Sequence, residues 1–127
     1  MSEQGRIKDY LKIVTEKLEF IQDSERFNSG DPIHDLVAIS IEISNIKMTT
    51  NIYRVYFLTM GEIQFASFRM NVIGPIKDFF ELFCKESIEK TELDPVKAEI
   101  MLTYARKKIG IFVHDLKFKK LTSAFDE

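Results

Sequence analysis

Apolar positions near the start of the chain recur every three or four residues. They are Ile7, Tyr10, Leu11, Val14, Leu18 and Ile21, and Lys8, Lys12, Glu16 and Glu19 fall between them. This spacing places the apolar side chains on one side of a helix and the charged ones on the other. The run 28–32, Asn-Ser-Gly-Asp-Pro, predicts that the helix stops there, because its glycine and proline do not continue a helical ladder.

The period of the pattern changes to two between residues 36 and 46. Val37, Ile39, Ile41 and Ile43 alternate there with Ala38, Ser40, Glu42 and Ser44. Alternation of this kind is typical of a strand with one buried face.

Two further runs, 52–60 and 63–72, are rich in β-branched and aromatic residues, and each follows a short turn. We therefore expect three strands joined as an antiparallel meander. The middle run carries apolar side chains on both faces: Tyr53, Val55 and Phe57 on one, and Ile52, Tyr56 and Leu58 on the other. A strand of this composition needs cover on both sides.

Helical signals return in the second half of the chain. Gly74-Pro75 predicts the start of a second helix, and Asp94-Pro95 predicts the N-cap and first residue of a third. Residues 109–113 fit either a continued helix or a short strand, and we favour the helix. The expected fold is one α+β domain over residues 1–127, with an N-terminal helix, a three-stranded antiparallel meander and two or three C-terminal helices.

Composition adds an aromatic load and one cysteine to this picture. Eleven Phe and four Tyr in 127 residues carry more apolar surface than is usual, and we expect part of it at an interface. Cys84 alone permits neither an internal disulfide nor a Cys-rich zinc site, which is typical of a reducing compartment. The start has no apolar signal-peptide region, and no apolar run is long enough to span a bilayer. We expect a cytoplasmic protein that does not contact membranes.

Candidate catalytic motifs are sparse. The five glycines form neither GxGxxG nor GxxxxGK[ST], so ATP and NAD are not expected. His34-Asp35 and His114-Asp115 repeat the dipeptide with which the HD family of phosphohydrolases holds a metal, but there is no third histidine to complete the family's ligand set. Cys84 borders an apolar helical stripe and is expected to pack in the core. The sequence predicts no enzyme, no metal and no cofactor, with a metal-dependent hydrolase on the two His-Asp pairs as the second alternative.

Positive charge is concentrated between residues 105 and 120. The basic residues are Arg106, Lys107, Lys108, Lys117, Lys119 and Lys120. Only Asp115 opposes them, so this segment carries +5 in a chain of net charge −2. Cations interleaved with a ring such as Phe112 favour binding of phosphates and stacked bases. The expected order of elements also resembles the double-stranded-RNA-binding domain, although only Lys77 stands where that family has a lysine cluster. Nucleic-acid binding is the first alternative function.

The two-sided apolar run 52–60 favours protein–protein interaction instead. Its second face must be hidden by the C-terminal helix, by a second copy or by another protein. We expect a homodimeric adaptor, small chaperone or immunity-type protein that uses an apolar sheet face and Phe-rich helices. The residues expected to bind the partner are Tyr53, Val55, Phe57, Phe65 and Phe68. The order of elements resembles small bacterial secretion chaperones, which hold extended partner segments as dimers.

Overall fold

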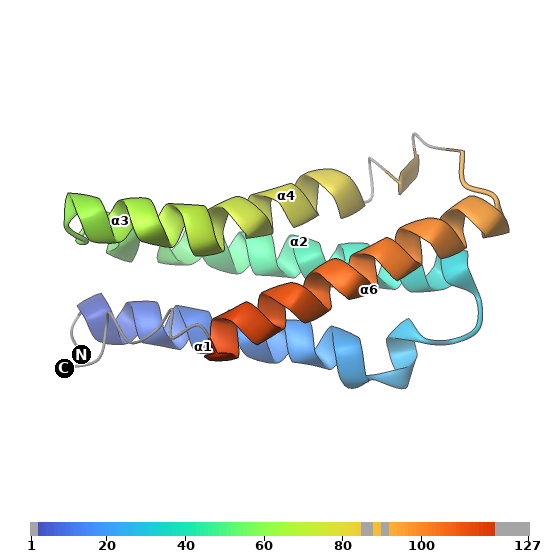
Figure 1. Cartoon of the computed structure of the whole chain (residues 1–127), viewed down its shortest axis with the longest axis horizontal. Coiled ribbons are helices and arrows are strands. Elements are labelled where there is room, and N and C mark those ends of the chain that lie inside the picture. Colours follow the sequence, from blue (N-terminus) through green and yellow to red (C-terminus); the bar gives the residue numbers. More distant parts are fainter. Residues whose placement is uncertain (1–2, 85–87, 90–91, 119–127) are drawn as a thin grey trace.

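The computed structural model describes residues 3–84, 88–89 and 92–118, and these residues form helices and turns without any strand. The helices are α1 (Glu3–Asp23), α2 (Pro32–Phe57), α3 (Glu62–Phe68), α4 (Gly74–Phe83) and α6 (Pro95–Phe118). Figure 1 shows that α3 and α4 follow one another as one rod, and that α1, α2, this rod and α6 run alternately back and forth. The chain is a helical bundle, and the predicted α+β fold is wrong.

The predicted first strand, 36–46, lies inside α2 because two periodicities overlap in it. Leu36, Ile39, Ile43 and Ile46 are buried at spacings of three and four, whereas Ile41, which alternation grouped with Ile39 and Ile43, is exposed. The start of α2 is also strongly marked, since the Asp31 carboxylate accepts hydrogen bonds from the backbone N–H groups of Ile33 and His34. The dipeptide Asp31-Pro32 therefore opens a helix as well as ending the connection before it.

The other two predicted strands are also helical. Residues 52–57 finish α2, a turn follows, and Glu62 begins α3. Phe57 and Phe68 face each other with ring centroids 4.9 Å apart, and both rings pack around Tyr10 of α1. The meander does not exist, so the resemblances to RNA-binding domains and secretion chaperones lose the strands on which they rested.

Between α3 and α4 the rod contains a π-helical turn, η2 (Arg69–Ile73). The Gly74 N–H bonds to the Arg69 carbonyl, five residues back. Pro75 has no N–H and its ring crowds the preceding turn, so a widened turn before it lets the helix continue without a break. Gly74 permits this close geometry because an added Cβ would lie 3.1 Å from the Arg69 carbonyl oxygen. The α-helix α4 thus begins at Gly74 with Pro75 in its first turn, as predicted, and it follows the π-helical turn without a break.

The core lies where α2 packs against α1, α4 and α6, with α6 also packed on α1. All six apolar residues predicted for the inner side of the first helix are buried, which confirms that prediction. Residues 109–113 are helical, as favoured, and Ile109, Phe112 and Val113 face the core. Gly110 lies close to α1, since a Cβ there would come within 3.6 Å of the Gln22 side chain.

Candidate interaction groove between α4 and α6

The five residues predicted to bind a partner do not share a surface. Phe57 and Phe68 are buried, Tyr53 and Phe65 are partly buried, and only Val55 is exposed. Because the described residues contain no strand, a dimer through a sheet face is impossible, and that functional prediction is wrong.

Tyr10 is the centre of an aromatic cluster inside the bundle. Its ring centroid lies 5.6 Å from that of Tyr53 and 5.0 Å from that of Phe57. The Thr50 hydroxyl donates to the Ile46 carbonyl, so the Tyr10 hydroxyl is the donor in its 2.7 Å bond to Thr50. Burial raises the pKa of Tyr10 to about 12, against a smaller lowering by the bond to Thr50. This cluster is structural, because its polar atoms are satisfied within the core.

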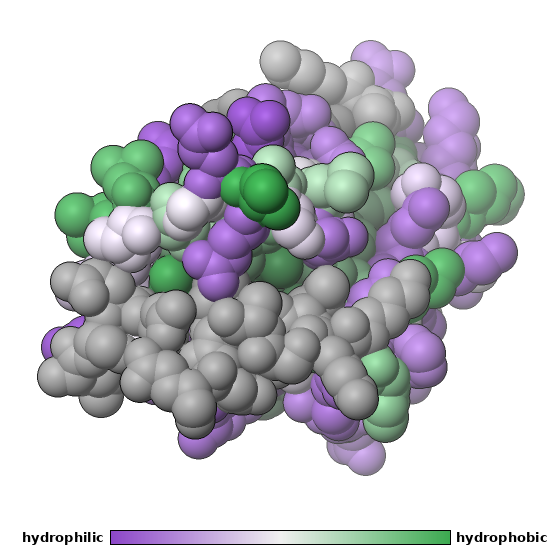
Figure 2. All heavy atoms as spheres, turned by 60° about the vertical axis from the view of Figure 1, so that its left-hand side comes forward, coloured by the Kyte–Doolittle hydropathy of each residue, from purple (hydrophilic) through white to green (hydrophobic). Residues whose placement is uncertain are grey.

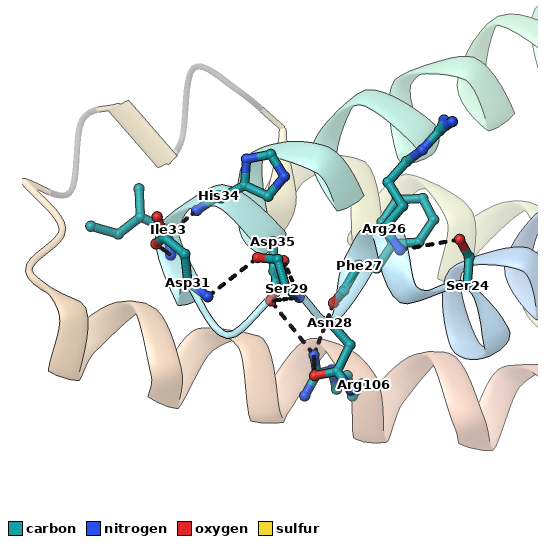
Figure 3. Close-up of polar contacts among 10 residues, drawn as sticks. All are labelled: Ser24, Arg26, Phe27, Asn28, Ser29, Asp31, Ile33, His34, Asp35 and Arg106. Atoms are coloured by element: carbon teal, nitrogen blue, oxygen red, sulfur yellow. Dashed lines mark hydrogen bonds and ion pairs between the residues drawn. The ribbon is translucent and has the colours of Figure 1, made fainter.

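The connection between α1 and α2 is fastened to α6 by a buried carboxylate and an arginine (Figure 3). The Asp35 carboxylate accepts from the backbone N–H and the hydroxyl of Ser29. Arg106 donates to the Phe27 carbonyl at 2.9 Å and to the Asn28 side chain at 3.2 Å, and its Nη2 lies 3.9 Å from Asp35 Oδ2. Arg106 therefore holds the loop in place, which is a structural task.

The remaining described basic residues of the predicted patch have different neighbours and do not form one surface. Lys117 pairs with Glu19 of α1 at 3.0 Å, and Lys108 lies over the Tyr104 ring with its Nζ 5.4 Å from the centroid. Lys107 is exposed. Lys119 and Lys120 lie outside the described residues. The segment that looks continuous in sequence is thus spread around a helix.

The two His-Asp pairs lie beside different parts of α6. Asp35 lies beside Arg106, and His114 comes eight residues later, about 12 Å farther along the helix. Among the described residues, no three His, Cys, Asp or Glu side chains converge where a metal ion could be held. The alternative of a metal-dependent hydrolase built on both pairs is therefore wrong.

Cys84 is buried at the end of α4, as predicted. The neighbouring Phe83 packs against Tyr104, with ring centroids 6.1 Å apart. His114 lies ten residues beyond Tyr104, which is about 15 Å along α6. The cysteine consequently has no imidazole beside it from that helix to act as a base.

A groove of about 510 Å³ runs between the α3–α4 rod and α6. Phe79 and Phe112 meet at its floor with ring centroids 5.7 Å apart, and both are largely buried. The walls carry apolar side chains that remain exposed: Met70, Leu82, Tyr104 and Ile111. Asn71 and Pro75 also line it, so the π-helical turn shapes one wall.

The rim of the groove is mainly acidic. Of the described residues that line it, Asp78, Glu81 and Asp115 are acidic, and Lys108 is basic. Glu81 lies 3.9 Å from Lys77 and Asp115 lies 3.8 Å from His114, both at the surface. The groove thus combines an apolar floor with a rim that favours cations.

Sequence reasoning missed this groove because it did not predict that the α3–α4 rod and α6 would lie side by side. The signal was the apolar residues that do not fit a core stripe: Met70, Leu82 and Ile111 are exposed although each belongs to a helix with its own buried face. Other exposed apolar residues lie away from the groove, and several of them belong to α2. Figure 2 brings forward the end of the bundle where α2 passes into α3, and apolar side chains there stand among hydrophilic ones. Leu58 and Ile63 lie in this region.

None of the described helices is long and apolar enough to cross a membrane. Comparison with protein families, with curated proteins and with solved structures found no match for this chain. The function must therefore be inferred from the groove and from the surfaces around it.

Proposed function

We propose that this chain is a protein-binding helical module that holds an amphipathic, basic helix of a partner in the groove between α4 and α6. The observation that carries the proposal is the groove itself, with Phe79 and Phe112 at its floor and carboxylates on its rim. A partner helix laid there would bury apolar side chains at spacings of three and four, and its flanking Lys or Arg residues would face the rim.

A protein segment fits this groove better than a small polar molecule does. Sites for such molecules place a few fixed polar groups inside an apolar cavity. Here the floor is apolar and the charged groups stand at the rim, while no buried side-chain N or O atom of the described residues lacks a hydrogen-bond partner. The interior therefore offers shape and apolar surface, and the rim offers charge.

The proposed role is binding without catalysis, in the cytoplasm. The single buried cysteine supports a reducing compartment. Nucleic acid is not the proposed partner, because Arg106 and Lys117 are engaged by other parts of the bundle and the groove rim is acidic.

Peptide display against the purified chain tests this function. We expect selected peptides to carry apolar residues at helical spacing with Lys or Arg between them, and to bind more weakly as salt rises. Fluorescence anisotropy with a selected peptide should show roughly tenfold or greater loss of affinity in Ile111→Glu, because this change puts a charge on the groove wall.

The matched control is Ile100→Glu on the same helix. Ile100 is exposed and is not among the residues that line the groove. This variant should bind the peptide within about twofold of the original chain. Equal losses in both variants, or selection of acidic peptides, would contradict the proposal.

A further inference from the structure

Lys108 is a cation in a groove whose other described charged residues are acidic. Its Nζ lies 5.4 Å from the centroid of the Tyr104 ring, one turn earlier on α6, so the ring supports the lysine side chain at the rim. None of the ion pairs between described residues includes Lys108. A partner can therefore engage its ammonium group without breaking an ion pair of the described bundle.

The two walls of the groove carry different patterns of charge. On the α4 wall the described charged residues are Asp78 and Glu81, which are three residues apart and lie on the same side of that helix. On the α6 wall they are Lys108 and Asp115, which are seven residues apart and about 10.5 Å apart along the helix. A helix in the groove therefore meets negative charge along one flank. Along its other flank it meets a positive charge and, two turns away, a negative one.

We propose that Lys108 selects partner helices that carry an Asp or Glu opposite it. This inference rests on the proposed function, because it concerns the same basic helix in the same groove. A Lys or Arg opposite Lys108 would bring two cations together, so helices that are basic on both flanks are rejected. Lys108 is thus a specificity-determining residue of the groove.

The charge pattern of the walls defines the pattern of the partner. Its flank against α4 carries Lys or Arg, opposite Asp78 and Glu81. Its flank against α6 carries one acidic residue opposite Lys108 and, seven positions away, a basic residue opposite Asp115. Seven residues are two turns in the partner helix as in α6, so both pairs form in one register.

Charge reversal at Lys108 tests this selection, because its effect has a sign. With a carboxylate opposite Lys108, the variant Lys108→Glu should bind a selected peptide about three- to tenfold more weakly at low salt, and the difference should shrink as salt rises. Without that carboxylate, Lys108 only repels a basic peptide, and Lys108→Glu should bind it more tightly. Fluorescence anisotropy measures the difference.

The matched control is Lys107→Glu, which makes the same change in net charge one residue away. Lys107 is exposed and is not among the described residues that line the groove. This variant should bind the peptide within about twofold of the original chain or slightly more tightly, because it changes only the long-range attraction of a basic peptide. Tighter binding by Lys108→Glu, or equal effects of the two reversals, overturns the proposal.

A charge swap tests direct pairing. A peptide whose acidic residue is changed to Lys should regain affinity for Lys108→Glu, and peptide display repeated on that variant should select Lys or Arg at this position. Absence of this rescue overturns the pairing.

The variant Ile111→Glu separates this inference from the proposed function. If Ile111→Glu weakens binding while Lys108→Glu strengthens it, the helix binds in the groove and only the role of Lys108 is wrong. If Ile111→Glu has no effect, the peptide binds elsewhere and both proposals are wrong. Circular dichroism checks that each variant keeps its helix content.

Discussion

Replacing Arg106 by Ala tests whether this residue fastens the α1–α2 connection. Its guanidinium makes two hydrogen bonds to that connection and lies 3.9 Å from the buried Asp35 carboxylate. The substitution removes both bonds. It also leaves the carboxylate with Ser29 as its hydrogen-bonding partner and without the nearby positive charge.

The expected loss of stability is about 2–3 kcal/mol. A hydrogen bond from a charged donor contributes about 1.5–3 kcal/mol when shielded, but the Arg106 side chain is 43% exposed, so we assign roughly 1 kcal/mol to each. Loss of the positive charge near Asp35 adds about 1 kcal/mol, well below the 3–5 kcal/mol of a fully buried pair. At about 4 °C per kcal/mol, the melting temperature should fall by roughly 8–12 °C.

Urea unfolding followed by circular dichroism measures this loss. The matched control is Lys107→Ala, one residue along the same helix and exposed, which should change the free energy of unfolding by less than about 0.5 kcal/mol. Arg106→Lys should fall between the two, because a lysine keeps the charge but cannot reproduce the guanidinium fork. Equal urea midpoints for Arg106→Ala and Lys107→Ala would refute the conclusion that Arg106 holds the α1–α2 connection against α6.

Three further changes have defined outcomes. The Tyr10 pKa of about 12 exceeds its ordinary value of 10.0. The contribution of this group to the free energy of unfolding is therefore complete below pH 10, and it is lost as the pH rises to 12, because the unfolded chain loses the phenol proton first. The loss is roughly 3 kcal/mol, and Tyr10→Phe should flatten that part of the stability curve, whereas an unchanged slope would argue against the burial effect. Asp31→Ala should cost about 0.5–2 kcal/mol in urea titrations, and Asp31→Asn much less, since Asn also caps helices. Phe112→Ala should cost about 3–5 kcal/mol by thermal unfolding, and a loss below 1 kcal/mol would mean that its ring does not pack at the groove floor.

The sequence allowed the first helix and the start of α6 to be predicted, because their signals were unambiguous. The inner stripe of α1 contains no competing alternation, and Asp94-Pro95 opens α6 at Pro95. The prediction of a strand over residues 36–46 was wrong because Ile39 and Ile43 fit both a two-residue alternation and a helical spacing. Whether Ile41 faces in or out decides between them, and this depends on neighbours that a single sequence does not place.

The candidate site was less predictable than the fold. Arg106, Lys108 and Lys117 are close in sequence, yet one holds a loop, one lies over Tyr104 and one pairs with α1. Charge density along a chain does not fix which direction each side chain takes around a helix. The groove depends on the rod and α6 lying side by side, which local patterns do not determine.

The meeting point of the four rods has a consequence for synthesis of the chain. Leu18, Ile43, Ile76 and Phe112 come together around one small internal space, so that layer contains side chains from α1, α2, α4 and α6. Translation proceeds at about 5–20 residues per second, so the 69 residues from Ile43 to Phe112 take roughly 3–14 s to add. During that interval α1 and α2 present apolar surface that α4 and α6 cover in the folded bundle. The nascent chain should therefore need chaperone protection until α6 emerges.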